Sequence, residues 1–398
     1  VKSLWQHLKR TFMDGDGKPP SHLHQLQLPP SIADLPFLLN RIEGASLLTD
    51  KVALTRLLHH TSATGNAHRD NTRGVYSCLQ PLTLVLSTMA DCNAWYQQHG
   101  KRHHLWVKKE ARQSQGNGIL FLSSAGIDEG GEEQLCQKLL LAATERPFVL
   151  QRHIDRPLLL EGKKSELRAY WFIASVDPLI AFMYHRGTVR LASENYPSQP
   201  LTGDLLQAHP TAHILNVAQQ KKHHRRSSSS DSSDAPLSME RLKWDWDRWE
   251  ADLRQRGLIP RNENGNETSF VDSVLVPSIR RMLQIVLKKS KRQLKAAMGA
   301  GKRRWELFGM DMLIEEKAKE NDGGGGDCIY LTDDLRLFLT EIQVGPGLSV
   351  QDNPVKQQLL SPMLQSMLDI VLEVDERRLK NTGFKDLHVE ESWLPLYG

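Results

Sequence analysis

Two apolar runs near the carboxyl end of the chain, WELFGMDMLI and LRLFLTEIQV, carry oxygen-bearing side chains. Asp311 lies in the first run, and Glu341 and Gln343 lie on one face of the second, because side chains alternate along a strand. If the runs pair as a hairpin, all three side chains gather on one face, where a hard cation such as Mg²⁺ would remove the cost of a buried carboxylate. The other interpretation makes the carboxylates partners of Arg168 or Arg190 in structural salt bridges. Residue types alone do not separate these two interpretations.

Basic side chains recur in the expected strands upstream of this pair. LEGKKSELRAYWF places Lys164, Glu166 and Arg168 on one face at a period of two, and Arg190 comes from a later strand. Guanidinium groups bind phosphate or carboxylate through two hydrogen bonds, so their convergence suits a polyanion. For any single one of these residues, a solvated charged face is the more common outcome.

Two weaker signals also suit a nucleotide. Lys108 and Lys109 precede RQSQGNGI, a polar glycine loop whose backbone N–H groups could close on phosphate. A strand follows this loop, so it is neither a Walker loop nor a dinucleotide fingerprint, and a bare GxG is more often a hairpin turn. Residues 151–154 lie where the chain crosses between two expected lobes, and backbone polar groups at such a crossing can bind a flat base.

Apolar periodicity predicts the elements that would position these residues. Strands are expected at 82–87, from 105, and at 119–124, 148–154, 165–175, 179–187, 187–196, 305–316 and 335–344. Helices are expected at 49–61, 132–143, 243–257, 271–297 and 356–374. The strands at 165–175 and 179–187 are joined by VDP, a turn that indicates an antiparallel hairpin. The pattern predicts an α+β fold with largely antiparallel sheets.

The predicted organisation has three regions. We expect an N-terminal region at 1–48, a central lobe at 49–153 and a C-terminal lobe at 154–398. The C-terminal lobe would contain a disordered insertion at about 218–240, because AQQKKHHRRSSSSDSSD is charged and of low complexity. The insertion lacks the interleaved aromatic residues of a nucleic-acid stacking surface.

Composition limits the class of protein. The formal net charge of +4 suits an acidic partner but is too small to indicate nucleic acid. The four cysteines are widely spaced and form no CxxC pair, so we expect free thiols in a reducing compartment and no zinc site. No apolar run is long enough to span a bilayer. The first residues are polar and lack an initiator Met, so we expect a fragment or a processed form without a secretory signal.

In their order along the chain, these stretches resemble the tubulin–tyrosine-ligase-like family, ATP-grasp enzymes that join an amino acid to a protein carboxylate. The resemblance runs from about residue 36 to 372. It is carried by TDKVALTRLL, WVKKEARQSQGNGI, the block from VLQRHIDRP to RLASENY, and ELFGMDMLI with LTEIQVGPGLS. It implies an ATP-grasp fold whose nucleotide cleft lies between the central and C-terminal lobes.

The resemblance also implies roles for individual residues. The nucleotide phosphates would be contacted by Lys51 and Lys109, with Lys108 as the alternative to Lys109, and by a loop containing Gln115, Gly116 and Gly118. The adenine-binding hinge would be Gln151, Arg152, His153 and Ile154. The phosphates and the acceptor carboxylate would be surrounded by Lys164, Glu166, Arg168, Arg190 and Asn216. Arg168, Arg190 and Glu341 would be catalytic, and Asp311, Glu341 and Gln343 would hold Mg²⁺.

Three positions depart from the family pattern. The family usually has Asp at Glu166, Thr at Leu215 and Asn at Gln343. Glu and Gln keep the oxygen but lengthen its reach by one methylene, and Mg²⁺ tolerates little geometric error. The departures therefore leave a catalytically weak or inactive tubulin- or nucleotide-binding protein as the alternative to an active ligase.

The activity that the resemblance implies is ATP-dependent addition of a free amino acid, with glutamate favoured, to a carboxylate of tubulin through an acyl phosphate. ATP and Mg²⁺ would be the cofactors, and tubulin or microtubules the partner. We expect a monomer that binds neither nucleic acid nor membrane and acts in the cytoplasm on the cytoskeleton, with the cilium or basal body as one setting. The basic stretch 287–304 would attract acidic tubulin tails, and a solvated helix end is its equal alternative.

Overall fold

The computed structural model describes residues 38–59, 77–100, 104–113, 117–123, 131–144, 146–197, 202, 209–215, 220, 242–259, 268–299, 301–316, 328–348 and 353–397. The expected insertion at 218–240, apart from Gln220, lies outside these residues, as do Gln115, Gly116 and Asn216. The described residues form two sheets with helices packed on them, so the predicted α+β class is confirmed.

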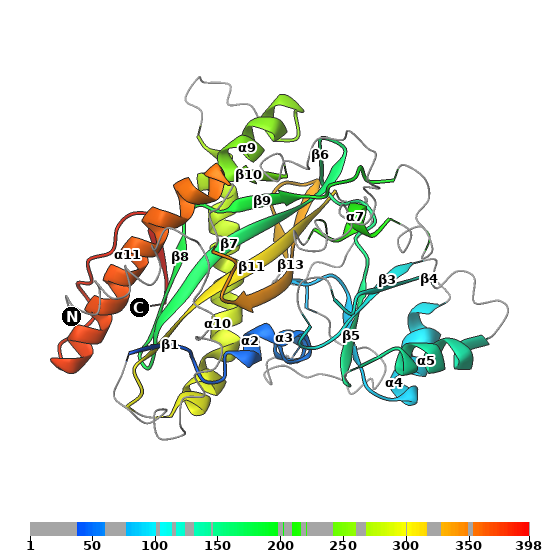
Figure 1. The fold of residues 1–398 in the computed structure, drawn as a ribbon, viewed down its shortest axis with the longest axis horizontal. Helices are drawn as coiled ribbons and strands as arrows, with labels where there is room; N and C mark the ends of the chain where they lie inside the picture. The colour runs from blue at the N-terminus through cyan, green and yellow to red at the C-terminus, as the bar shows by residue number, and fades with distance from the viewer. Residues whose placement is uncertain are drawn as a thin grey trace, which may run out of the picture.

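The smaller sheet has four antiparallel strands in the order β2-β5-β3-β4. The strands are β2 (Thr83–Leu86), β3 (Leu105–Lys109), β4 (Leu120–Ser123) and β5 (Phe148–Arg152). The helices α4 (Met89–Trp95), η3 (Tyr96–Gly100) and α5 (Gly131–Leu141) lie beside it, on the right of Figure 1. Trp95, Trp106 and Phe148 fill the core of this part of the molecule.

The larger sheet has ten strands, six of which follow the order β10-β9-β7-β11-β13-β12. Their bounds are β7 (Lys163–Val176), β9 (Thr188–Leu191), β10 (Lys243–Asp245), β11 (Arg304–Glu316), β12 (Ile329–Tyr330) and β13 (Leu335–Val344). The remaining four are β1 (Leu39–Asn40), β6 (Leu159–Leu160), β8 (Leu179–Tyr184) and β14 (Trp393–Tyr397). Only the β1–β11 pair among these is parallel. The predicted β7–β8 hairpin and the predicted pairing of the two oxygen-bearing runs, β11 with β13, are both confirmed.

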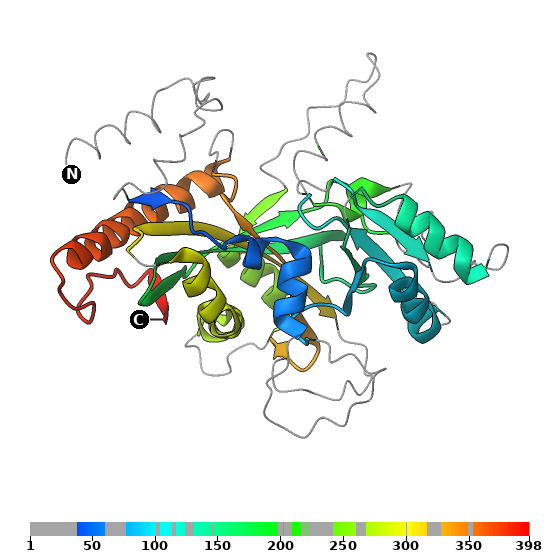
Figure 2. The ribbon, with the colours of Figure 1, turned by 90° about the horizontal axis from the view of Figure 1, so that it is seen from below.

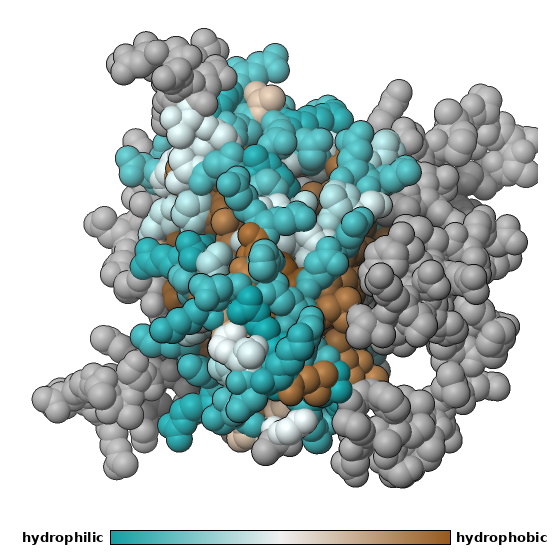
Figure 3. Space-filling view, turned by 90° about the vertical axis from the view of Figure 1, so that its left-hand side faces the viewer, coloured by the Kyte–Doolittle hydropathy of each residue, from teal (hydrophilic) through white to brown (hydrophobic). Residues whose placement is uncertain are grey.

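Helices cover both faces of the larger sheet. On β7, Leu167, Ala169 and Trp171 belong to the core that contains α9 (Trp246–Gln255), η4 (Val271–Leu275) and α10 (Val276–Met298). Tyr170 and Phe172 face the other way and pack with α11 (Pro354–Leu379). Figure 2 shows α10 and α11 on opposite sides of the sheet. The outer surface on the α11 side is mostly hydrophilic (Figure 3), and no helix in the described part of the chain is long and apolar enough to cross a bilayer.

Two short helices, α2 (Ser46–Thr49) and α3 (Lys51–His59), lead into the smaller sheet. Asp50 caps α3, because its Oδ1 accepts hydrogen bonds from the backbone N–H groups of Val52 and Ala53. Leu54 and Leu58 of α3 pack into the core of the larger sheet. The boundaries proposed for the lobes, at 49 and 153, therefore stay a prediction.

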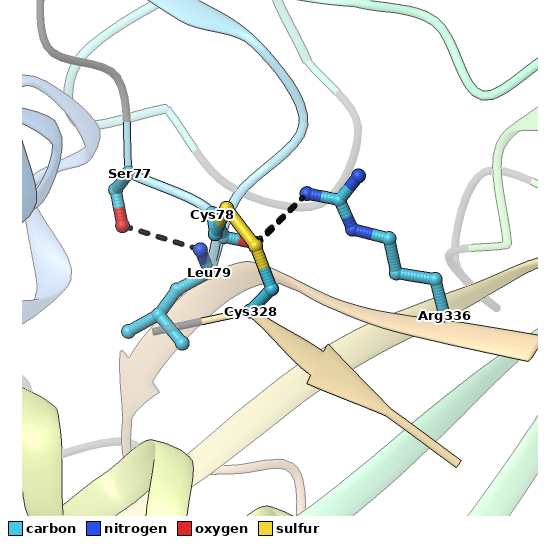
Figure 4. The surroundings of a disulfide bond; sticks show 5 residues. All are labelled: Ser77, Cys78, Leu79, Cys328 and Arg336. Carbon is cyan, nitrogen blue, oxygen red and sulfur yellow. Dashed lines mark hydrogen bonds between the residues drawn. A yellow bond between two sulfur atoms is a disulfide. The ribbon is translucent and has the colours of Figure 1, made fainter. Parts of the chain in front are cut away.

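The prediction of free thiols is wrong. The structure joins Cys78 to Cys328 and Cys92 to Cys136, and no free cysteine remains among the described residues. The second pair connects α4 to α5, the two α-helices beside the smaller sheet. The first connects the segment that leads into β2 to the start of β12, with Arg336 beside it (Figure 4).

Candidate functional site

Strand register brings charged side chains together on the larger sheet. Arg168 on β7 lies opposite Asp311 on β11, and Asp311 lies opposite Glu341 on β13. In the neighbouring row, Glu166 on β7 lies opposite Arg190 on β9. Residues directly opposite one another point to the same face of a sheet. Four adjacent strands therefore present two arginines and three carboxylates on one face.

Asp311 is the centre of this charged cluster and is almost fully buried. Its Oδ1 accepts a hydrogen bond from Nε of Arg168 at 2.5 Å, and its Oδ2 accepts one from Nη2 of Arg168 at 2.7 Å. Arg190 Nη2 lies 2.5 Å from Asp311 Oδ2. Burial alone would raise the pKa of Asp311, but the two arginines lower that pKa to about 2. Asp311 is therefore ionised at neutral pH, and the arginine pairs that the salt-bridge interpretation predicts are present.

Gly309 makes room for this arrangement. It lies on β11 two residues before Asp311, so it faces the same side of the sheet. A Cβ at this position would lie 3.3 Å from Cδ of Arg168 and 3.0 Å from Cβ of Pro346, both closer than most carbon contacts. The approach of Arg168 to Asp311 thus depends on the absence of a side chain at residue 309.

Glu166 carries the least favourable charge of the cluster. Arg190 donates a hydrogen bond to its Oε2 at 2.5 Å, and the hydroxyl of Thr340 lies 3.3 Å from its Oε1. Burial raises the pKa of Glu166, Arg190 opposes that rise, and the carboxylates of Asp311 and Glu341 add to it, which brings the pKa to about 7. A cation placed nearby would favour the ionised form of Glu166.

The smaller sheet supplies the opposite wall of a cavity. On the side of the smaller sheet, the cavity is lined by Val107, Lys109, Glu110, Gln113, Asn117, Ile119, Phe121 and residues 151–154. From the larger sheet it is lined by Lys164, Glu166, Arg190, Asp311, Leu313, Thr340 and Glu341, and Lys51 at the start of α3 also reaches it. The two faces thus bring together most of the described residues for which the sequence predicted a role.

The pleat of β3 separates the two adjacent lysines. Lys109 Nζ donates a hydrogen bond to Oε1 of Gln151 at 2.7 Å and lines the cavity. Lys108 is buried on the other face, where its Nζ contacts Oε1 of Glu110 at 2.6 Å and the carbonyl of Ala142 at 3.0 Å. The structure therefore places Lys109 in the cavity, and Lys108 is paired outside it.

Lys51 contacts the start of the glycine loop, and both line the cavity. Lys51 Nζ donates to the carbonyl of Gln113 at 2.7 Å and lies 3.6 Å from Oε2 of Glu341. Gly118 has φ +68°, and a Cβ there would lie 2.7 Å from Cγ of Glu110. Residue 118 is therefore restricted to glycine by both backbone conformation and space.

The expected hinge is held by hydrogen bonds of its own. Gln151 Nε2 donates to Oγ1 of Thr83 at 2.9 Å, so its amide connects Thr83 to Lys109. The backbone N–H groups of Arg152 and His153 donate to the carbonyls of residues 82 and 105. Those two donors are used within the sheet, which fixes the hinge against the cavity.

A pair of buried histidines lines the same cavity, and sequence reasoning missed one of them. His213, at the end of α7 (Pro210–His213), lies 5.9 Å from His153 and 5.8 Å from Phe121 between ring centroids. Neither ring nitrogen of His213 nor Nε2 of His153 has a hydrogen-bond partner among the described residues. Burial lowers the pKa of His153 to about 4 and that of His213 to about 3, aided at His213 by the charge of Lys164. Both rings are neutral at pH 7. His213 can offer one donor and one acceptor, whereas Nδ1 of His153 lies 3.3 Å from Oδ1 of Asp155, which leaves Nε2 of His153 for a ligand.

The three expected Mg²⁺ ligands lie together. Gln343 Nε2 donates to Oδ2 of Asp311 at 3.2 Å, and Glu341 lies opposite Asp311. In the described part of the chain, no three His, Cys, Asp or Glu side chains are grouped as a metal site. Carboxylate and amide oxygens are nevertheless the ligands that Mg²⁺ takes. The donor set fits Mg²⁺, with the one-third-exposed Glu341 the most accessible carboxylate and Asp311 shared with the arginines.

The sequence of this chain is similar to a known protein family and to several of its members. A sequence model of the tubulin-tyrosine ligase family matches residues 36–380. "Probable alpha-tubulin polyglutamylase Ttll1" of Tetrahymena thermophila is 24% identical over 280 residues, which cover 70% of this chain and 56% of that protein. "Protein polyglycylase TTLL10" of Rattus norvegicus is 26% identical over 305 residues, covering 74% and 38%. "Probable tubulin polyglutamylase TTLL2" of Homo sapiens is 24% identical over 334 residues, covering 82% and 45%.

This chain spans about half or less of the length of those three relatives. The family match, by contrast, extends over most of the chain, from before β1 to the end of α11. The two sheets and the cavity between them agree with the ATP-grasp-like fold of that family. The chain therefore belongs to the tubulin-tyrosine ligase family.

Proposed function

We propose that this protein is an ATP-dependent ligase that joins a free amino acid to a carboxylate of tubulin, with glutamate as the amino acid. A carboxylate oxygen of the acceptor attacks the γ-phosphorus of ATP, and ADP leaves, giving an acyl phosphate. The amine of the free amino acid then attacks the acyl carbon, loses a proton and expels inorganic phosphate. The product is an amide bond, and no covalent bond to the enzyme is needed.

One observation supports the proposal most strongly. A single cavity between two sheets is lined by three lysines, Lys51, Lys109 and Lys164, and by an arginine that contacts two carboxylates. Phosphoryl transfer depends mainly on positioning and on neutralising charge. The two walls would supply the positioning, and the lysines and Arg190, with a cation held by the carboxylates, would supply the neutralisation. Burial lowers the pKa of Lys164 to about 8 and also lowers that of Lys109, as expected for cations that lack a full complement of anions.

Particular residues have proposed roles in this chemistry. Lys51 and Lys109 bind the phosphates, and Gln151 to Ile154 hold the adenine beside the neutral rings of His153 and His213. Arg190 and Arg168 orient the acceptor carboxylate and stabilise charge that develops on the acyl phosphate. Gln115, Gly116 and Asn216, which lie outside the described residues, complete the proposed phosphate contacts. The walls of the cavity keep water away from the acyl phosphate.

Asp311, Glu341 and Gln343 would hold Mg²⁺, which when bound neutralises phosphate oxygens and favours the ionised form of Glu166. Without the metal, those carboxylates would repel a triphosphate. Glu341 therefore has two proposed effects: it holds the cation, and it positions Lys51, which lies 3.6 Å away.

The substrate assignment comes from the relatives. Two of the three are named as tubulin polyglutamylases and one as a protein polyglycylase. We therefore propose tubulin as the protein partner and the cytoskeleton of the cytoplasm as the place of action. Other relatives are named as glycylases, so the relatives do not decide between glutamate and glycine, and the proposal of glutamate rests on the family resemblance of the sequence. A monomer is sufficient for this proposal, because every proposed role falls on residues of one chain.

Incorporation of labelled amino acid tests the proposal. The protein is incubated with ATP, Mg²⁺, microtubules and labelled glutamate or glycine, and label on tubulin is counted. We expect incorporation by the wild type and none by Glu341→Ala. Glu391→Ala, at an exposed position near the carboxyl end, is the matched control and should retain activity.

A non-catalytic nucleotide-binding protein is the second candidate. It is favoured by one observation: both oxygens of Asp311 already accept hydrogen bonds from arginines, and Gln343 donates a third. Tight binding of ATP without incorporation of any amino acid by the wild type would establish this candidate and reject the ligase.

A further inference from the structure

Lys243 extends the charged row beyond the cavity. It lies on β10 directly opposite Arg190 on β9, so the two side chains point to the same face of the sheet. Arg190 in turn reaches Glu166 and Asp311, each at 2.5 Å. The order across the strands is therefore lysine, arginine, glutamate, with Lys243 at the outer end. Lys243 does not line the cavity proposed for the nucleotide.

The outer end of this row is short of negative charge. Lys243 makes no hydrogen bond or ion pair with any residue that the structure describes. The two carboxylates nearest the row, Glu166 and Asp311, are already shared by Arg190 and Arg168, and Nε of Arg190 is buried without a hydrogen-bond acceptor among the described residues. Four basic side chains, including a second lysine described next, thus face these two carboxylates, and the third carboxylate of the cluster, Glu341, lies 3.6 Å from Lys51.

The second lysine comes from α11. Lys356 lies in the first turn of that helix, is buried, and donates a hydrogen bond from Nζ to the carbonyl of Gly347 at 2.6 Å. Burial, together with repulsion from Lys356, Arg190 and Arg168, lowers the pKa of Lys243 to about 7, although Asp311 opposes part of the change. Burial and the same two arginines lower the pKa of Lys356 to about 8. Holding these cations together costs free energy that an anion would recover.

We propose that Lys243, supported by Lys356, binds a carboxylate of an acidic substrate beside the reacting centre. A carboxylate fits because Arg190, the neighbour of Lys243, has an N–H without an acceptor in the described part of the chain, and a cation beside such a donor can hold a planar anion. The inference rests on the proposed function for the reaction, and it adds a determinant that favours glutamate over glycine. Two sources carry this chemistry: the side chain of a free glutamate donor and a glutamate of the acceptor chain.

Equilibrium binding tests the inference without requiring turnover. Titration calorimetry with a non-hydrolysable ATP analogue present compares glutamate with glutamine, and a glutamate-rich peptide with its glutamine-substituted counterpart. We expect the wild type to prefer the acidic member of at least one pair. Lys243→Met should reduce that preference about tenfold or more, while the affinity for the ATP analogue stays unchanged. Loss of preference within the amino-acid pair identifies the donor, and loss within the peptide pair identifies the acceptor.

Two control variants keep the result interpretable. Lys138→Met removes an exposed lysine of α5 and should change no affinity. Lys243→Arg keeps the positive charge and should keep the preference. Lys243→Met should unfold at the same temperature as the wild type or a higher one, because it removes a cation that has no partner among the described residues.

Three outcomes overturn the inference: a wild type that does not distinguish glutamate from glutamine in either pair, an undiminished preference in Lys243→Met, or an equal loss in Lys243→Arg. Failure of the ligase proposal is recognised separately, as absence of amino-acid incorporation by a wild type that still binds carboxylates.

Discussion

Glu250, which is buried, and Glu166, which is largely buried, differ in how the fold satisfies their charges. Glu250 on α9 accepts hydrogen bonds from the backbone N–H groups of Phe270 and Val271, both at 2.8 Å, and from Arg254 and Ser269. Burial would raise the pKa of Glu250, but these four donors together hold it below its ordinary value. Glu166 has one arginine, shared with Asp311, and a pKa raised to about 7.

The difference lies in where the partners come from. The partners of Glu250 come from its own helix and from the start of the helix that packs on it, so the carboxylate is fully satisfied inside the fold. The partners of Glu166 are Arg190 and Thr340, which come from two other strands of the larger sheet, and its one arginine is shared with Asp311. A charge that the fold leaves incompletely satisfied is a charge available to a ligand.

The largest expected effect is the difference between Arg190, which contacts Glu166, and Arg254, which contacts Glu250. If the ligase proposal holds, Arg190→Gln should lower kcat/KM for amino-acid incorporation by about 10²–10³-fold, because a cation next to developing charge is lost. Arg254→Gln should change kcat/KM by less than about twofold. Steady-state assays of both variants check this, and equal effects on kcat/KM at the two positions would contradict the prediction.

The next effect concerns stability. Glu250→Ala should lower the free energy of unfolding by about 3 kcal/mol, because two backbone N–H groups and an arginine lose their acceptor in a buried setting. Glu166→Gln, which keeps the size of the side chain, should not destabilise the protein. Urea unfolding at pH 7 measures both, and a Glu250→Ala protein as stable as the wild type would contradict the prediction.

The pH dependence of stability should distinguish the same two residues. Because the pKa of Glu166 is raised, the folded state binds more protons than the unfolded state between about pH 4.5 and 7, so this residue makes stability fall as pH rises through that window. Glu166→Gln should therefore unfold at a higher temperature than the wild type at pH 7.5, and at nearly the same temperature at pH 4.5.

Glu250 should act in the opposite direction. Its folded-state pKa is lowered, so its contribution is present above the unfolded pKa and is lost as pH falls through the folded value. Thermal unfolding across the same pH range checks the predictions for Glu166 and Glu250. A stability gain of Glu166→Gln that does not change with pH would refute the prediction for Glu166.

The smallest effect concerns charges that solvent already satisfies. Lys288, Lys291 and Arg292 are exposed on α10. Lys289 is half-buried and donates to the carbonyl of Leu58 at 3.1 Å, so it belongs to the fold. Replacing the three exposed residues with Gln should weaken microtubule co-sedimentation a few-fold and reduce its salt dependence. An unchanged salt profile would leave this stretch as a solvated helix face.

Local patterns were sufficient to predict the long helices and strands, but they missed α4 and β14 and predicted a helix where residues 243–245 form β10. The β7–β8 hairpin, the β11–β13 pair and α10 follow from runs of apolar residues, and their alternation alone puts Glu166 and Arg168 on one face. Register cannot be obtained in this way. Lys243 stands in KWDWDRWEADL, whose spacing indicates only a helix, and nothing local shows that it lies opposite Arg190.

Long-range pairing was the other limit. Cys78 and Cys328 are 250 residues apart, and Cys92 and Cys136 are 44 apart, so spacing could not pair them. The choice between Lys108 and Lys109 needed the phase of β3 relative to the cavity. His213 belongs to a four-residue helix with no periodic signal. In each case the missing information was the position of a distant segment.

The bond between Cys78 and Cys328 has a mechanical consequence. It fastens the chain just before the smaller sheet to an edge strand of the larger one, and the neighbouring carbonyl of Leu79 accepts a hydrogen bond from the N–H of Leu339 at 2.7 Å. The two lobes cannot slide apart along this edge while those links hold. If the cleft widens, we expect a rotation with its axis near the crosslink, so that displacement grows with distance from residue 78.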